Sequence, residues 1–246
     1  MSVLKVEMVQ SIKTELRLTI ALDCSGSMYN ENKLNWSKKA VIDLLTTFRN
    51  MDNIAANVAI YQIGEDRGWV GGRFYNESEF SELIPMIDRV EAGGQTPLYD
   101  SLVDIFEYYE QNKNNNSYNL VILVSDGREE SDDTVNQFID VQNALMDAEC
   151  YFAFIGYGDR EEYKDYEILV QNSTIPTEAY FPNMKPKFIV REFQKFFRKL
   201  FKRYNIYWKS SSAENGEQVD VEMKLVYKSV DGAKIETRTN FKYKSK

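Results

Sequence analysis

Residues 16–28, LRLTIALDCSGSM, decide the fold of this chain. The run up to Leu22 is mostly apolar and predicts a strand that becomes fully buried toward its end. Asp23 ends this strand, and Ser25 and Ser27 follow it with a glycine between them that allows a tight bend. Ligands of parallel α/β sheets bind beyond the carboxyl ends of the strands. This D-x-S-G-S turn therefore predicts a binding site.

Outward from this turn, apolar runs alternate with segments of helical periodicity, as in a parallel sheet covered by helices. We expect an α/β fold whose central sheet is mostly parallel and has six strands. The strands are predicted at residues 16–22, 57–63, about 74–75, 120–124, 151–155 and 178–181. The flanking helices are predicted at residues 33–51, 80–90, 97–110, 134–148, 162–171 and 187–203.

Two further segments are expected at the same edge of the sheet. Thr96 lies in GGQTPLYD, residues 93–100, just before a predicted helix, and Asp126 lies in the S-D-G turn after the most continuous apolar run. Because strands 16–22 and 120–124 are predicted neighbours, both segments should meet the first turn. Three hydroxyls and two carboxylates then surround a space of divalent-ion size, and hard oxygen donors suit such a cation.

In this order, the D-x-S-G-S turn, the G-G-x-T-P-L-Y-D segment and the S-D-G turn resemble the von Willebrand factor A (VWA) family. The sequence IGYGD at residues 155–159 is similar to the I-G-x-G end of that family's fifth strand. The resemblance covers roughly residues 16–203. It implies a Rossmann-like fold that carries a metal-ion-dependent adhesion site.

The resemblance assigns five metal-site positions, all of them filled here: Asp23, Ser25, Ser27, Thr96 and Asp126. It implies that the serines and the threonine ligate the metal through their hydroxyls. The two carboxylates would act largely through water and hydrogen bonds. Cys24 departs from the family pattern, which has an apolar residue there, and we expect its side chain to point into the core.

A first shell of mostly neutral hydroxyls leaves the cation much of its charge and one position open. We therefore expect a partner protein's Asp or Glu carboxylate to complete the shell, with the metal as a bridge. Mg²⁺ is the expected ion, and Mn²⁺ and Ca²⁺ are alternatives. Family members outside cells serve in adhesion, whereas members inside cells tend to serve in multiprotein complexes, often beside ATPases.

The composition excludes most other chemistry. Histidine is absent, which removes Ser-His-Asp and Cys-His catalysis and every His-based metal centre. A net charge of −8 disfavours nucleic acid as a partner, because phosphate binding needs a basic surface. The two cysteines, Cys24 and Cys150, are too few for a disulfide framework or a zinc site.

The pattern changes after residue 203, where three runs alternate between polar and apolar residues and Asp231-Gly232 predicts a hairpin. We expect a small antiparallel β appendage, with which an N-terminal strand at residues 4–9 could pair. The predicted parts are an N-terminal strand, a VWA domain and the appendage, at residues 1–15, 16–203 and 204–246.

The chain holds no apolar run of about 18 residues, so no transmembrane segment is predicted and a soluble protein is expected. Its N-terminus lacks the apolar stretch of a signal peptide. We therefore expect a cytoplasmic protein. A signal peptide removed beforehand would instead place it outside the cell or in the periplasm.

Two other functions stay open beside the binding module. A metal-dependent hydrolase or phosphotransferase would use Asp23 as its nucleophile, but Ser25 stands where such phosphatases carry a second carboxylate. The second alternative is a scaffold protein that binds partners through the β appendage and holds a metal with a structural role. Neither G-x-G-x-x-G nor a P-loop is present, which disfavours a nucleotide-binding enzyme.

Two features favour structural roles. Asp100, four residues after Thr96, is expected to be a hydrogen-bonding group and not a ligand. The last predicted helix carries basic residues on one face and a row of phenylalanines on the opposite face. We interpret it as a packing helix with a solvated basic face, with a membrane-surface or partner helix as the alternative.

Overall fold

The computed structural model describes residues 2–8, 14–51, 54–114, 117–127, 129–158, 163–173, 179–200, 204–209, 218–228 and 234–244. For residues 2–8, 14 and 198, and from residue 204 onward, it describes the backbone alone. The chain divides into two units. One consists of Met1–Val9 together with Arg203–Lys246, and the other, which we call the site domain, is Gln10–Lys202.

The site domain is built on a sheet that has seven strands in the described part of the chain. All pairings from β3 to β8 are parallel, whereas β4 and β5 run antiparallel to β3. The predicted α/β fold with a mostly parallel sheet is confirmed. In spatial order the strands are β4 (Gly68–Trp69), β3 (Ile54–Ile63), β2 (Thr14–Asp23), β6 (Ser117–Ser125), β7 (Tyr151–Gly156) and β8 (Tyr180–Phe181), with β5 (Tyr75–Asn76) also on β3.

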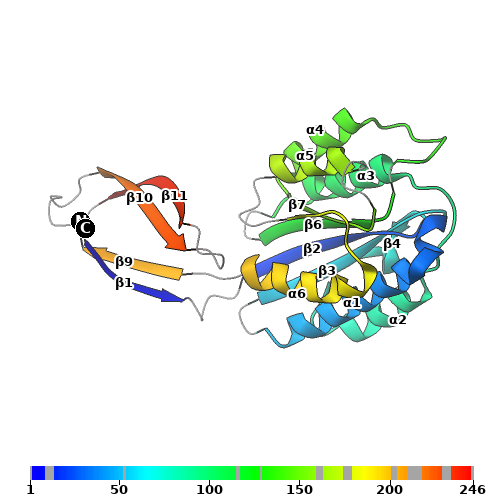
Figure 1. The fold of residues 1–246 in the computed structure, drawn as a ribbon, viewed down its shortest axis with the longest axis horizontal. Coiled ribbons are helices and arrows are strands. Elements are labelled where there is room, and N and C mark those ends of the chain that lie inside the picture. The colour runs from blue at the N-terminus through cyan, green and yellow to red at the C-terminus, as the bar shows by residue number, and fades with distance from the viewer. Residues whose placement is uncertain are drawn as a thin grey trace. The chain divides into compact units, whose positions relative to one another are not determined.

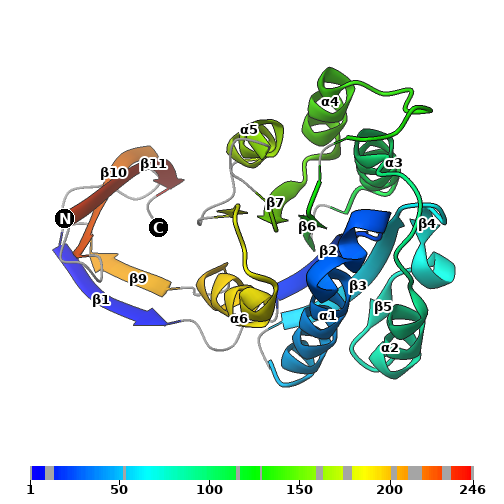
Figure 2. The same cartoon turned by 45° about the vertical axis from the view of Figure 1, so that its right-hand side comes forward.

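Helices cover both faces of this sheet (Figures 1 and 2). On one face lie α1 (Lys33–Arg49), α2 (Phe80–Arg89) and α6 (Ile189–Leu200). On the other lie α3 (Leu98–Gln111), α4 (Phe138–Ala148) and α5 (Lys164–Asn172). Short 3₁₀ helices join some of these elements: η1 (Gly26–Asn32), η2 (Val70–Gly72) and η4 (Pro186–Phe188).

The middle strand β2 is buried on both of its faces, because helices cover both sides of the sheet. Leu18, Thr19, Ile20 and Ala21 are all fully buried, although successive side chains of a strand point to opposite faces. The one polar member, Thr19, shares a hydrogen bond of 3.0 Å with the hydroxyl of Tyr109 in α3. The apolar run that ends at Leu22 thus lies in the centre of the core.

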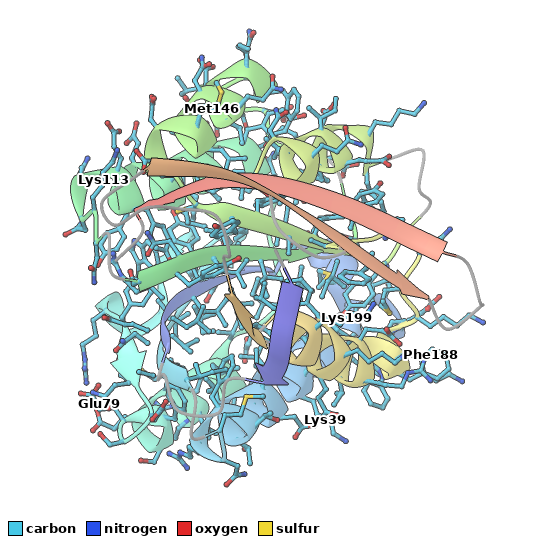
Figure 3. All side chains as sticks on the ribbon, turned by 90° about the vertical axis from the view of Figure 1, so that its left-hand side faces the viewer. Lys39, Glu79, Lys113, Met146, Phe188 and Lys199 are labelled. Carbon is cyan, nitrogen blue, oxygen red and sulfur yellow. The ribbon has the colours of Figure 1, made fainter. Side chains whose placement is uncertain are left out.

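The final helix α6 packs against this core. Its Phe193, Phe196 and Phe197 are buried. Just before it, Phe188 is 37% exposed, and the charges of Lys187 and Arg191 lie 5.1 and 4.7 Å from its ring centre (Figure 3). The described part of α6 is therefore a packing helix with a basic outer face.

The number of strands differs from the six predicted. The residues after β3 turn back twice and supply two short edge strands, β4 and β5, where one was expected near residues 74–75. Trp69 of β4 lies opposite Tyr61 of β3, and the two rings contact edge to face with their centroids 5.1 Å apart. A two-residue strand carries no alternation of polarity, so its sequence did not reveal it.

The start of α4 also differs, because this helix begins at Phe138 and not near Thr134. The backbone N–H groups of Val135 and Asn136 donate to the Asp100 carboxylate and are not part of a helix. A capping box between Gln137 and Asp140 then starts the helix. The tertiary contact with Asp100 thus overrides the local helical pattern.

The second unit contains two strand pairs. β1 (Ser2–Met8) runs antiparallel to β9 (Tyr204–Lys209), so segments from the two ends of the chain pair with each other. β10 (Gln218–Lys228) runs antiparallel to β11 (Lys234–Lys244). In the second pair, Val221 lies opposite Phe241 in the register.

Some predictions fall outside the described residues. They are the Asp231-Gly232 turn, the last position of IGYGD, and the first residue of the helix expected at 162–171. The start of the strand expected at 178–181 and the end of the helix expected at 187–203 are outside them as well. Among the described helices, none is long and apolar enough to cross a membrane.

Candidate metal site

The candidate site lies where two central parallel strands end side by side. Leu22 of β2 is paired with Val124 of β6, so the residues that follow them leave the sheet at the same edge. Asp23 follows on one strand, and Ser125 and Asp126 follow on the other. The predicted adjacency of these two strands is confirmed.

Asp23 is held entirely by the protein. Its side chain is fully buried, Oδ1 accepts the Ser25 N–H at 2.8 Å, and Oδ2 accepts the Ser125 hydroxyl at 2.5 Å. Burial raises the pKa of Asp23 to about 6, and the hydrogen bonds from Ser125 and Ser25 lower it in part. Both oxygens are thus used within the protein, which matches the indirect role that the VWA resemblance implies for this carboxylate.

The two serines and Asp126 form a chain of close oxygen atoms. The hydroxyls of Ser25 and Ser27 lie 3.1 Å apart, and the Ser27 hydroxyl donates to Asp126 Oδ1 at 2.6 Å. The second oxygen of Asp126 accepts from the ammonium group of Lys33 at 2.5 Å. Lys33 was not expected at this site. It is the first residue of α1, and its approach depends on the path of η1.

Backbone hydrogen bonds bring the segment of Thr96 against the first turn. The Gly93 N–H donates to the Cys24 carbonyl at 2.7 Å, and the Gly26 N–H donates to the Gly94 carbonyl at 3.2 Å. Thr96 itself is 4% exposed. It lies one residue before Pro97, the position that caps α3.

The loop after Asp126 is tied to the Thr96 segment. Thr96 and Glu130 form an isolated antiparallel bridge. Glu129 Oε2 accepts the Tyr99 N–H in the first turn of α3 at 2.6 Å. No sequence pattern predicts this contact, because Glu129 lies in an acidic run that would ordinarily be solvated.

Other residues confirm the structural roles expected of them. Cys24 is buried, and its thiol donates to the Leu22 carbonyl at 3.2 Å. Asp100 accepts from the backbone of Asn136 at 2.8 Å and pairs with Arg67 at 3.3 Å. Neither side chain is free to serve as a ligand in this arrangement.

The donors present fit a small, hard cation. Among the described residues, no group of three or more His, Cys, Asp or Glu side chains could hold a metal. An ion at this edge would therefore depend on the serine and threonine hydroxyls beside the two carboxylates, a donor set of hard oxygens. That the five predicted residues hold an ion stays a prediction.

Known proteins share the fold of this chain. Residues 18–203 match the family model of the von Willebrand factor type A domain. No curated protein sequence matches the chain.

Several solved structures share the fold at low sequence identity. A von Willebrand factor type A protein from Catenulispora acidiphila matches with a TM-score of 0.61 and 15% identity, over 98% of this chain and 72% of that one. The PilB minor pilin from Streptococcus sanguinis matches with a TM-score of 0.54 and 12% identity, over 78% of this chain and 62% of that one. Proximal thread matrix protein 1 from the mussel byssus matches with a TM-score of 0.54 and 14% identity, over 82% of this chain and 50% of that one. Identities this low show the fold alone.

Proposed function

Because the chain belongs to the von Willebrand factor type A domain family, whose members commonly mediate protein–protein interactions, we propose that it is a non-enzymatic, metal-dependent protein-binding module. Its site would be Asp23, Ser25, Ser27, Thr96 and Asp126. Its ligand would be an Asp or Glu side chain of a partner protein. Mg²⁺ is the proposed ion.

One observation carries this proposal. The Ser25 and Ser27 hydroxyls and the Asp126 carboxylate are linked in one cluster at the end of the two central strands. Ser27 is exposed, so the cluster opens to solvent. The oxygens of Asp23 lie behind it, fully buried. A cluster with an exposed hydroxyl side and a buried anionic side is suited to hold a cation that faces a partner.

Each residue has a part that follows from its environment. Asp23 fixes the Ser25 backbone and places negative charge beneath the hydroxyls. Asp126 orients the Ser27 hydroxyl by accepting a hydrogen bond from it. When bound, a divalent cation would supply the positive charge that attracts a partner's carboxylate. The neutral hydroxyls would leave most of that charge uncompensated.

The hydrolase alternative gains no support from the geometry. A nucleophilic Asp23 would need a free oxygen facing solvent, but both oxygens accept hydrogen bonds and the side chain is fully buried. The scaffold alternative rests on residues 204–246, whose described strands are defined only by their backbone. The metal-bridge function is therefore the one that the site favours.

Two measurements test the proposal. Calorimetric titration with MgCl₂ and MnCl₂ should show one binding site in the wild type, and the Ser25→Ala/Ser27→Ala variant should lose it. An array of short peptides that differ only by a central Glu or Gln should then capture the wild type at the Glu peptides, in MgCl₂ and not in EDTA.

Ser78→Ala is a matched control, because Ser78 is exposed and its hydroxyl bonds only to Asn76 among the contacts described. It should bind metal like the wild type. Capture that ignores both EDTA and the double serine substitution would overturn the metal-bridge function. Capture that is lost only on deletion of residues 204–246 would favour the scaffold alternative.

A further inference from the structure

Lys33 places a positive charge directly on the candidate metal site. Its ammonium nitrogen lies 2.5 Å from Asp126 Oδ2. The Lys33 side chain is 17% exposed and that of Asp126 only 1%, so this contact is largely withdrawn from solvent. With Ser27 on the other oxygen, both oxygens of Asp126 are occupied within the protein.

The position of Lys33 in its helix does not explain this charge. Lys33 is the first residue of α1, and the first turn holds no acidic residue. The positive end of the helix dipole disfavours a cation at this position. The dipole of α1 therefore disfavours the positive charge of Lys33, and the Asp126 carboxylate stabilises that charge.

The backbone before Lys33 is also unusual. Glu31 and Asn32 both adopt left-handed conformations, with φ of 55° and 56°. Such conformations are unfavourable for residues other than glycine, and they cluster at functional sites. They are the last two residues of η1, which begins in the D-x-S-G-S turn, and they directly precede Lys33 at the start of α1.

We propose that Lys33 is a tethered cation that neutralises Asp126 in the metal-free protein and competes with the divalent ion for this carboxylate. The inference rests on the proposed metal site. It adds that Lys33 sets the metal affinity: ion binding must weaken the Lys33–Asp126 pair, and the protein therefore binds its metal less tightly than the five site residues alone would allow. Lys33 thus acts through Asp126 and is a positioning residue, not a ligand.

Removal of the competing charge gives the first test. Calorimetric titration with MnCl₂ should show that Lys33→Gln binds about tenfold more tightly than the wild type, or tighter still. Lys33→Arg keeps the charge and should stay near the wild-type affinity. Lys39→Gln is the matched control, because Lys39 is exposed on the same helix and its ammonium lies over the Trp36 ring, 5.5 Å from its centre (Figure 3).

Thermal unfolding gives a readout that needs no bound metal. In EDTA, Lys33→Gln should lower the Tm, because Asp126 is left as a buried charge without its partner. Addition of MgCl₂ should raise the Tm of Lys33→Gln by more than it raises that of the wild type or of Lys39→Gln.

A third measurement uses the wild type alone and so stands even if Lys33→Gln does not fold. Brief acetylation followed by mass spectrometry should label Lys33 slowly in EDTA and faster in saturating MgCl₂, with Lys39 unchanged. Equal metal affinities of the wild type and Lys33→Gln would overturn the inference and leave the proposed function standing. Metal binding that leaves the labelling of Lys33 unchanged would do the same. If neither protein binds metal, the inference and the proposed function are both wrong.

Discussion

At the scale of single residues, Asp23 shows how the site opposes the stability of the fold. Its carboxyl is fully buried, and burial raises its pKa from 3.8 to about 6, despite the hydrogen bonds from Ser125 and Ser25. In the metal-free chain, its contribution to stability is fully present below about pH 4 and is lost as the pH rises through about 6. At neutral pH the folded protein therefore carries an unfavourable buried charge.

We predict that Asp23→Asn stabilises the metal-free protein at pH 7.5 by roughly 1–3 kcal/mol, because the amide needs no buried charge. The gain should shrink as the pH falls from 7 to 4, since the wild-type carboxyl is then protonated in the folded state. Urea unfolding in EDTA at several pH values measures this. A variant that is less stable than the wild type at every pH would contradict the prediction.

The five candidate positions can be found in the sequence, because each lies in a short motif at the end of a strand or before a helix, and that they hold an ion stays a prediction. The sequence did not predict Lys33, whose long side chain reaches a carboxylate 93 residues away. Nor did it assign a role to Ser125, whose hydroxyl holds Asp23. Such contacts depend on the tertiary path of the chain, and no local pattern encodes them.

At the scale of the elements, the loop of Thr96 depends on a close backbone approach at Gly94. This residue has a φ of +75°, and a Cβ atom there would lie 2.7 to 2.9 Å from the Cβ, N and Cα atoms of Glu65. We predict that Gly94→Ala lowers the free energy of unfolding by about 2–4 kcal/mol and weakens Mn²⁺ binding. Urea unfolding and calorimetric titration check the two effects.

Gly72→Ala is the control that distinguishes backbone strain from a steric clash of the added Cβ. Gly72 has the same φ of +75°, but no atom lies within 4 Å of the added Cβ. It should cost only the backbone strain, about 1–2 kcal/mol, and leave metal affinity unchanged. Equal effects of the two substitutions on metal binding would show that the approach of Gly94 to Glu65 does not position the site.

Asp100 joins three elements near the site. It accepts from Val135 and Asn136 in the loop before α4 and pairs with Arg67 after β3. Burial alone would raise the pKa of Asp100, but these hydrogen bonds hold it below its usual value. Its contribution to stability is thus present above the unfolded pKa, near 4, and is lost as the pH falls through the folded pKa.

We predict that Asp100→Ala lowers the free energy of unfolding by about 1–3 kcal/mol at pH 7, because it leaves backbone donors without their acceptor. The loss should become smaller below about pH 4, where the wild-type carboxyl also loses its charge. Thermal unfolding at pH 7 and pH 3.5 measures both. Asp147→Ala, at an exposed position of α4, is the control. A loss that is independent of pH would contradict the role of the charge.

The long elements were predictable because their patterns extend over many residues. β2 and β6 are apolar runs, and α1 repeats its apolar positions at helical spacing. The short strand β4 and the start of α4 were not predictable, because both depend on partners elsewhere in the chain. Asp100, for example, decides the start of a helix that lies more than thirty residues later in the sequence.

At the scale of the whole molecule, the division into two units predicts that the site domain folds alone. A fragment of residues 10–202 holds the complete seven-stranded sheet of the described chain, with helices on both faces. We expect it to unfold cooperatively and to bind Mn²⁺ with the affinity of the full chain. Circular dichroism during heating and calorimetry test this, and a fragment without a cooperative transition would contradict it.

Removal of one end alone should behave differently. Deletion of residues 1–9 leaves β9 without β1, and an unpaired strand edge promotes association. We predict that this truncation self-associates in size-exclusion chromatography, whereas the fragment of residues 10–202 elutes as a monomer. A monomeric truncation would show that β9 needs no partner strand.

The antiparallel pairing of β1 with β9 also determines how a pulling force would pass through the chain. Met8 is paired with Tyr204, close in sequence to the points where the chain enters and leaves the site domain, and Ser2 is paired with Lys209 at the far end. Tension applied beyond Ser2 and Lys209 would open the residue pairs of this ladder one after another, starting with Ser2–Lys209. Until the Met8–Tyr204 pair opened, the load would not pass through the site domain.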